Sequence, residues 1–271
     1  MKLSRRILET AQRRLDPRWL ALLGSVAVSV KRRERCRVRY AGGDWVHRYR
    51  TGTVVQPHLG GPSASLQDQQ TWDTFLYAYR PKPADIVLDL GAGVGGEVRL
   101  LSRLVGPYGR VVSVEAHPRT FRCLCRTIEL NHLSNVTAVH RAVVGTTGTV
   151  FIEDRLAHAG NSITTAAADG VPVTGEPLGD LVERLRIDRI DLLKMNIEGA
   201  ELAVLESARE VLPMVDNLVV SCHDFKADRG GAEWQRTYTG VRVLLADAGY
   251  TLLHRPNDGR PWIPFYLYAS R

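Results

Sequence analysis

The sequence predicts an α/β fold in which helices cover both faces of a mostly parallel, seven-stranded sheet. Short apolar runs typical of strands alternate with helical stretches, and parallel strands need such crossover connections. A glycine-rich loop follows the first of these strands, as in nucleotide-binding α/β folds. At the other end, "YTLLHR" and "PFYLYA" flank a turn and indicate an antiparallel hairpin that completes the sheet.

Five strands and four helices are expected to follow one another over most of the chain. The strands are predicted at residues 85–90, 110–115, 136–143, 190–195 and 217–222. The helices are predicted near residues 97–105, 118–132, 178–185 and 200–212. A further helix, "SLQDQQTWDTFLYAYR", precedes the first strand and ends before Pro81 and Pro83.

The chain divides into a basic N-terminal part, residues 1–65, and a main domain, residues 66–271. Its 271 residues are 44% hydrophobic and 24% charged, which is the composition of a globular protein. The net charge is +7, yet residues 1–50 hold 14 Lys or Arg against 4 Asp or Glu, and the remainder holds 22 against 25. We predict a helix and short strands in residues 1–65, with a loop from residue 54, serving as a cap or docking element.

An apolar run of 12 residues, Trp19 to Val30, lies within this basic part. It is shorter than the ~20 residues that cross a bilayer, and the basic residues 31–33 that follow it argue against a secretion signal. We therefore predict a cytoplasmic protein. The helix is expected to pack a face formed by Trp19, Leu20, Leu22 and Leu23 on the main domain, and docking on a membrane surface or an acidic partner is the alternative.

The glycine loop predicts a nucleoside-binding site. Gly91, Gly93 and Gly96 form G-x-G-x-x-G between a strand and a helix, where the backbone comes close to a ligand at the carboxyl end of the sheet. Glu115 ends the second strand, 22 residues after Gly93, and a carboxylate there accepts ribose hydroxyls. The alternative for Glu115 is a salt bridge to a nearby arginine, Arg110 or Arg119.

Two details favour S-adenosylmethionine over a nicotinamide cofactor. Asp89 lies two positions before Gly91, and "VLDLGAG" resembles motif I of the class I methyltransferases. The C-terminal hairpin resembles the strand pair that separates those Rossmann-like enzymes from dehydrogenases.

A more specific resemblance extends from Trp72 to Phe225. The segments "VLDLGAGVGGE", "VVSVEAHPRTF", "GNSIT", "IDLLKMNIEGAE" and "VVSCHDF" resemble, in order and spacing, the FkbM-type methyltransferases. The resemblance implies O-methylation of sugars, polyketides or other secondary metabolites, with S-adenosylhomocysteine as product. Many relatives carry Asp at the position of Asn196. The residues predicted to bind the cofactor are Asp89, Gly91, Ala92, Gly93, Gly96, Glu97, Glu115, Ala142 and Asn196.

Methyl transfer to a hydroxyl needs alignment of the acceptor and a destination for its proton. We predict that His223 is the general base, because an imidazole titrates near neutral pH. Asp224 would orient His223, and Asn196 and Glu198 would contact the cofactor or the acceptor. The alternative for His223 is a hydrogen bond to loop backbone, and the alternative for Glu198 is an interaction with a helix N-terminus. Lys194 is expected to brace a carboxylate. A divalent cation held by the predicted catalytic residues is not favoured, because an amide and an imidazole are poor magnesium ligands.

Other functions use the same residues differently. N-methylation of an amino sugar or amino-cyclitol needs less help from a base. An inactive methyltransferase-like module that binds through the basic N-terminus is a second alternative, and a dehydrogenase is a third. No recognisable nucleic-acid motif is present. We expect a small-molecule acceptor that contains a sugar. The sequence leaves open whether the protein forms a homo-oligomer and whether its N-terminal part contacts a membrane.

Overall fold

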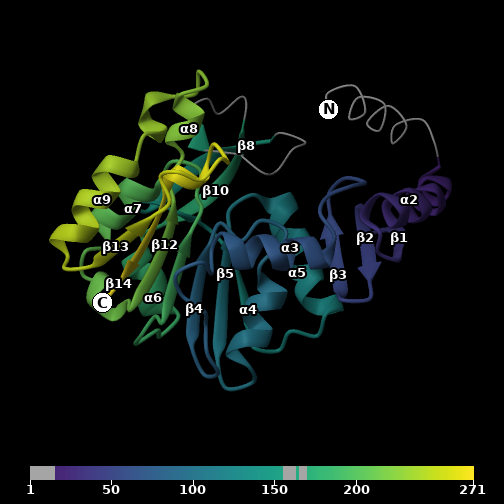
Figure 1. Cartoon of the computed structure of the whole chain (residues 1–271), viewed down its shortest axis with the longest axis horizontal. Helices are drawn as coiled ribbons and strands as arrows, with labels where there is room; N and C mark the ends of the chain where they lie inside the picture. The colour runs from purple at the N-terminus through teal and green to yellow at the C-terminus, as the bar shows by residue number, and fades with distance from the viewer. Residues whose placement is uncertain (1–15, 155–162, 165–169) are drawn as a thin grey trace.

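The computed structural model describes residues 16–154, 163–164 and 170–271. The sequence also predicts that the polar loop at residues 158–164 covers the cofactor or the substrate, and residues 158–162 of it lie outside these ranges. The main sheet has seven strands in the order β13-β14-β12-β11-β4-β5-β6 (Figure 1). Its strands are β4 (Ile86–Leu90), β5 (Arg110–Glu115), β6 (Val136–His140), β11 (Leu192–Met195), β12 (Asn217–Ser221), β13 (Thr251–His254) and β14 (Tyr266–Ser270).

The predicted sheet is confirmed. Strands β6, β5, β4, β11 and β12 run parallel, whereas β14 pairs antiparallel with both β12 and β13. The predicted strand at residues 136–143 is two strands, because β7 (Ala142–Val143) leaves the main sheet for a smaller one. That sheet has the order β7-β10-β8-β9, with β8 (Gly148–Glu153), β9 (Ile163–Thr164) and β10 (Gly170–Glu176), none of which the sequence analysis predicted.

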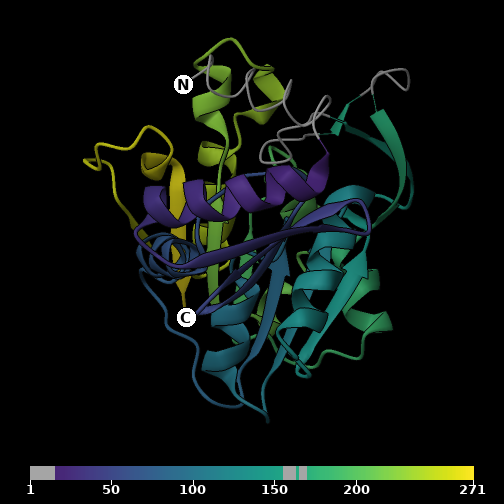
Figure 2. The same ribbon diagram turned by 90° about the vertical axis from the view of Figure 1, so that its right-hand side faces the viewer.

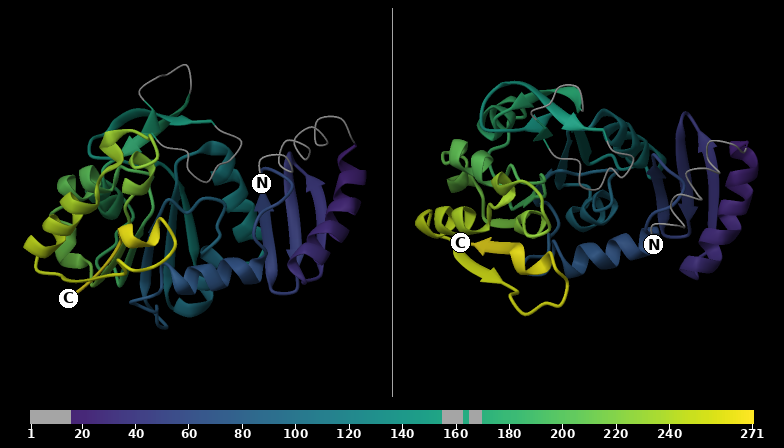
Figure 3. Two further views of the ribbon diagram at one scale, coloured as in Figure 1. Left: turned by 45° about the horizontal axis from the view of Figure 1, so that its top comes forward. Right: turned by 90° about the horizontal axis from the view of Figure 1, so that it is seen from above.

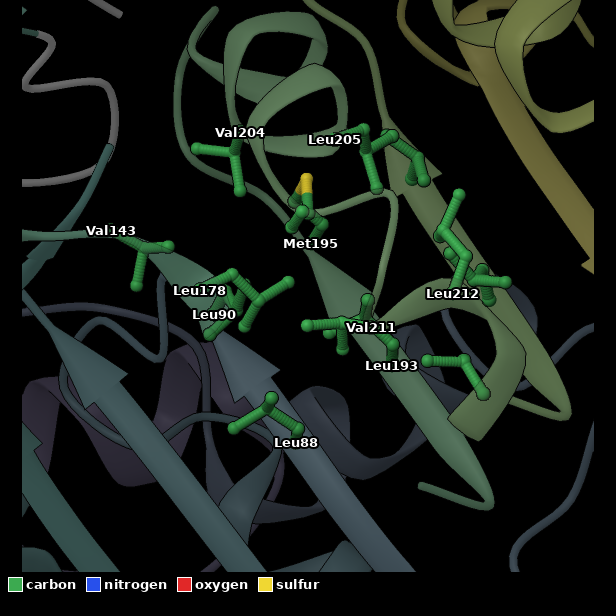
Figure 4. Close-up of a cluster of buried hydrophobic side chains, with 14 of the residues drawn as sticks. Leu88, Leu90, Val143, Leu178, Leu193, Met195, Val204, Leu205, Val211 and Leu212 are labelled. Atoms are coloured by element: carbon green, nitrogen blue, oxygen red, sulfur yellow. The ribbon is translucent and has the colours of Figure 1, made fainter. Parts of the chain in front are cut away.

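Helices bury apolar side chains on both faces of the main sheet. Alternate residues of each strand point to opposite faces, so Leu88 and Leu90 pack against one helical layer while Val87 packs against the other. The first layer is formed by α6 (Leu178–Arg184), α7 (Glu201–Ser207) and α9 (Tyr238–Asp247), and its side chains interlock with the strands in Figure 4. The second is formed by α4 (Val98–Val105) and α5 (Pro118–Leu130).

The N-terminal part is a three-stranded antiparallel sheet with a helix on its outer side (Figures 1 and 3). It comprises α2 (Pro17–Arg32), β1 (Cys36–Ala41), β2 (Asp44–Tyr49) and β3 (Gly52–Gln56). Residues 54–56, which were predicted to begin a loop, instead form the end of β3. Asp44 is fully buried and pairs with Arg122 and Arg126 of α5 at 2.7 and 2.9 Å. These ion pairs hold the small sheet to the main domain, together with hydrogen bonds that the N–H groups of Thr53 and Val55 in β3 donate to the side chains of Asn131 and Thr127.

The predicted packing face of the N-terminal helix is wrong. Leu20 is buried, but Trp19, Leu22 and Leu23 are exposed, and the residues that join Leu20 against the sheet are Ala21 and Gly24. The reason is local hydrogen bonding. The hydroxyls of Ser25 and Ser29 accept from the backbone N–H groups of Val38 and Cys36, each at 2.9 Å, so the small and polar face of α2 turns to β1.

Helices α4, α5 and α6 begin and end within two residues of the predicted bounds, but α9 was not predicted. α3 (Ala64–Asp73) is capped by Ser63, whose hydroxyl accepts from the N–H of Leu66 at 3.3 Å, and it ends seven residues before the predicted end at residue 80. α7 ends at Ser207, five residues before its predicted end. Among the described residues, no helix is long and apolar enough to cross a membrane.

Candidate active site

A cavity of about 840 Å³ opens at the carboxyl ends of β4, β5 and β11. The loops that follow these three strands form one side of it, and they carry most of the residues predicted to bind the cofactor. The other side is formed by the N-terminal part, by α3 and by the loop before β14. Cavities with one polar loop edge and mixed apolar walls are where α/β folds bind small molecules.

The glycine loop approaches the cavity with its bare backbone. Gly91 has φ 77°, and a Cβ there would lie 2.0 Å from the carbonyl oxygen of Asn196, so no side chain fits. Gly93 lines the cavity, and a Cβ there would meet nothing within 4 Å. The second tightly packed position is Gly95, at φ 84° against Val98 and Leu124, whereas the predicted Gly96 lines the cavity.

Asp89 and Lys194 support this loop from beneath. They form a buried ion pair at 2.8 Å, and the Lys194 ammonium donates to the carbonyl of Gly91 at 2.9 Å. Burial alone would lower the pKa of Lys194, but the carboxylates of Asp89 and Glu97 outweigh it and raise the pKa. Lys194 thus braces a carboxylate as predicted. Asp89 is fully buried and is not among the cavity-lining residues, so it holds the loop instead of meeting a ligand.

Glu115 lines the cavity beside Gly93. Its carboxylate accepts from the N–H of Gly93 at 2.8 Å, from the N–H of His117 at 2.9 Å and from the Thr120 hydroxyl at 3.0 Å. A carboxylate has about four acceptor positions, so one remains for a ligand hydroxyl. Burial raises the pKa of Glu115 despite these donors. The two arginines considered as salt-bridge partners bond elsewhere: Arg119 pairs with Asp154, and Arg110 donates to the Leu185 carbonyl.

Glu198 lies at the junction between β11 and α7 and lines the cavity with Asn196. It has φ 62°, a left-handed conformation that costs a residue with a side chain about 1–3 kcal/mol. Its Oε2 pairs with the Lys226 ammonium and lies 3.3 Å from Nε2 of His223. Burial alone would raise the pKa of Glu198, but these two cations lower it to about 2.

His223 is not placed as the predicted base. Its ring lies between two carboxylates, with Nδ1 2.8 Å from Glu201 and Nε2 3.3 Å from Glu198, and it is absent from the cavity lining. Burial alone would lower the pKa of His223, but both carboxylates together raise it to about 9. The ring is therefore an imidazolium at neutral pH and has no lone pair with which to accept a proton.

Asp224 does not orient His223 either. Its Oδ2 accepts from the N–H groups of Thr237 and Tyr238, each at 3.0 Å, and thereby caps the start of α9. The orienting carboxylate is Glu201, which sequence reasoning missed although it ends the signature "IEGAE". The described residues contain no group of three side chains arranged to hold a metal ion.

The second side of the cavity was not predicted from the sequence. One face of α3 supplies Gln67, Gln70 and Thr71, whose spacing of three and four residues is helical. The N-terminal part adds Lys31 and Gln56. Arg260 and Trp262 come from the loop before β14, where Asp258 and Asp73 pair with the Arg260 guanidinium.

Comparison with known proteins identifies the family. Residues 89–252, more than half of the chain, match the family model of the methyltransferase FkbM domain. The chain belongs to the FkbM methyltransferase family. This membership confirms the predicted resemblance, and it supports an S-adenosylmethionine-dependent methyltransferase over a dehydrogenase.

A solved methyltransferase structure agrees with this fold. A crystal structure of methyltransferase FkbM from Methylobacillus flagellatus KT is similar with a TM-score of 0.50 and 18% identity, covering 76% of this chain and 50% of that one. This chain therefore spans half the length of that relative. The fibrillarin of Aeropyrum pernix, solved with natively bound S-adenosylmethionine, gives a TM-score of 0.42 at 15% identity, covering 86% and 97% of the two chains. No curated protein matches the chain.

The methyltransferase has residues that fit its cofactor. Because Gly93 has no side chain, an open space, the cradle, lies beside the remaining acceptor position of Glu115. This space and this acceptor suit a ribose. Ala142 and Val143 form an apolar wall near it, suited to a flat base. Gly91, Ala92, Gly96, Glu97 and Asn196 line the same side of the cavity.

Proposed function

We propose that the methyltransferase methylates a hydroxyl of a sugar or of a glycosylated or polyketide-type secondary metabolite. The observation that carries this proposal is Glu198, a carboxylate fixed at the cavity in a left-handed conformation by two cations. Bound S-adenosylmethionine supplies an activated methyl group on a sulfonium centre. The protein's task is then to hold an acceptor oxygen in line and to receive its proton.

The cofactor would be held by the loops after β4, β5 and β11. Glu115 would accept a ribose hydroxyl, Gly93 would leave room for the nucleoside, and Ala142 would face the base. Asn196, beside Gly91, and Glu97, which follows Gly96, would bind the amino-acid part. Asp89 and Lys194 keep the loop in place from below.

The opposite side of the cavity supplies side chains suited to a hydroxyl-rich acceptor. Amides and hydroxyls both donate and accept, and Gln67, Gln70, Thr71 and Gln56 gather there with the ring of Trp262. Such groups can each pair with a sugar hydroxyl, whereas the ring covers an apolar sugar face. This lining supports a neutral polar acceptor.

Glu198 is the group that meets the acceptor hydroxyl. Both cations approach its Oε2, which leaves Oε1 to accept a hydrogen bond from the hydroxyl. With a pKa of about 2 the carboxylate is a weak base, so it orients the oxygen lone pair and takes the proton only as the new C–O bond forms. Lys226 and the His223 imidazolium position Glu198.

The test is methyl transfer from labelled S-adenosylmethionine to a panel of sugars, amino sugars and polyketides, with and without a chelator. We expect label on oxygen, unaffected by the chelator, and a loss of turnover of about 100-fold in Glu198→Gln. Glu206→Gln, which changes an exposed carboxylate of α7, is the matched control and should keep full turnover. Label on nitrogen with normal turnover in Glu198→Gln would instead establish an amino-sugar methyltransferase.

A further inference from the structure

The outer face of α2 carries a continuous apolar stripe. Trp19, Leu22, Leu23, Val26 and Val30 are 66%, 58%, 60%, 62% and 74% exposed, and their spacing places all five on one side of the helix. We call these five residues the α2 stripe. Figures 2 and 3 show α2 as the outermost layer at one end of the molecule, with the β1–β3 sheet behind it. Apolar patches of this kind on a protein surface mark interaction sites.

The outward orientation of the stripe is fixed by the fold. The opposite face of α2 packs Leu20, Ala21 and Gly24 on the small sheet, and Ser25 and Ser29 bind backbone N–H groups of β1. Turning the helix to bury the stripe would break both hydrogen bonds and leave those groups unpaired. The helix therefore holds the stripe outward whatever covers it.

Positive charge lies at both ends of the stripe. Arg18 lies at one end of α2 and Lys31 and Arg33 at the other, and all three are exposed. Residues 1–50 as a whole carry ten more basic than acidic side chains. An apolar helix face flanked by cations is the combination that binds an anionic membrane surface, where the apolar side chains enter the lipid and the cations meet the headgroups.

We propose that the α2 stripe docks this methyltransferase on an anionic membrane surface. A second copy of the chain would bring the same positive charge against itself, and a nucleic acid would meet the cations but gain nothing from five exposed apolar side chains. With 16 residues, α2 lies along the surface. Because Lys31 also lines the cavity, docking brings the membrane next to the acceptor side of the active site.

The test is sedimentation of the full chain with vesicles of pure phosphatidylcholine or of a roughly three-to-one mixture with phosphatidylglycerol, at about 0.1 M salt. We expect at least tenfold stronger binding to the mixed vesicles, weakened by added salt. The double variant Leu22→Glu/Val26→Glu should lose at least tenfold of it. Val243→Glu/Leu253→Glu, which places the same charges on exposed apolar positions elsewhere, should bind like the wild type.

Other results would overturn this proposal. One is equal binding to both kinds of vesicle, and another is full binding by the Leu22→Glu/Val26→Glu variant. A third is a wild-type protein that does not bind vesicles but forms a dimer, with the double variant monomeric. Salt-sensitive binding to polyuridine RNA in place of vesicles would overturn it as well. An unchanged melting temperature and unchanged methyl transfer in the double variant show that the loss of binding is not a loss of folding.

Discussion

His223 shows how two neighbouring carboxylates change what an imidazole can do. From the sequence it is a base at the end of a strand, but Glu198 and Glu201 hold its two ring nitrogens and keep it protonated. Its charge in turn keeps Glu198 ionised and fixed in direction. His223 is thus a positioning residue for Glu198, and it acts in the acid form.

This role predicts how turnover depends on pH. The pKa of His223 is raised from its ordinary 6.5 to about 9, so the imidazolium and the stability it contributes are fully present below 6.5 and are lost as the pH rises through about 9. We expect kcat to fall on the alkaline side with a midpoint near 9, and His223→Gln to remove that midpoint. A kcat that instead rises toward pH 9 in the wild type would make His223 the base.

The strand-end acids show why residue roles were only partly predictable. The sequence places Asp89, Glu115 and Asp224 at the correct edge of the sheet. It does not show that Asp89 turns inward to Lys194 or that Asp224 caps α9, because both outcomes depend on partners far away in the chain. Of these three acids, only Glu115 lines the cavity.

The strand-loop-helix unit around β4 is the element that makes the cofactor side. Gly91 and Gly95 are required by close packing, whereas Gly93 faces open space at φ 57°. Gly93→Ala should therefore fold with a loss of about 1–2 kcal/mol from the left-handed backbone. It should also weaken S-adenosylmethionine binding at least tenfold, because the new methyl group enters the cradle.

Calorimetric titration and thermal unfolding measure these two effects separately. Gly259→Ala is the matched control, since a Cβ at Gly259 also meets open space and its backbone is not left-handed. If Gly93→Ala binds the cofactor as tightly as the wild type, the cradle is not where the nucleoside lies.

Elements buried on both faces were the ones that sequence reasoning predicted well. Strands β4, β5 and β12 are mostly apolar because helices cover both of their sides. Strands β8 and β10 are partly exposed and contain glycine and proline, so they carry no such pattern. For α2, large apolar residues predicted the wrong face, because two serines decide which side meets β1.

At the scale of the whole molecule, the cavity joins parts that are distant in the sequence. Its cofactor side comes from one contiguous family domain, but its acceptor side combines the N-terminal part, α3 and the loop before β14. The predicted boundary at residue 65 is untested and stays a prediction. The acceptor side could not be predicted, since no local pattern brings Lys31, Gln56 and Trp262 together.

We propose that cofactor binding and acceptor activation depend on different residues of the same cavity. The most direct test of this proposal measures the Kd for S-adenosylmethionine and kcat in the same two variants. Glu115→Gln should raise the Kd at least tenfold, because the amide loses acceptor capacity for the ribose. Glu198→Gln should leave the Kd within threefold and lower kcat about 100-fold. Equal effects of both variants on the Kd and on kcat would contradict this division of roles between Glu115 and Glu198.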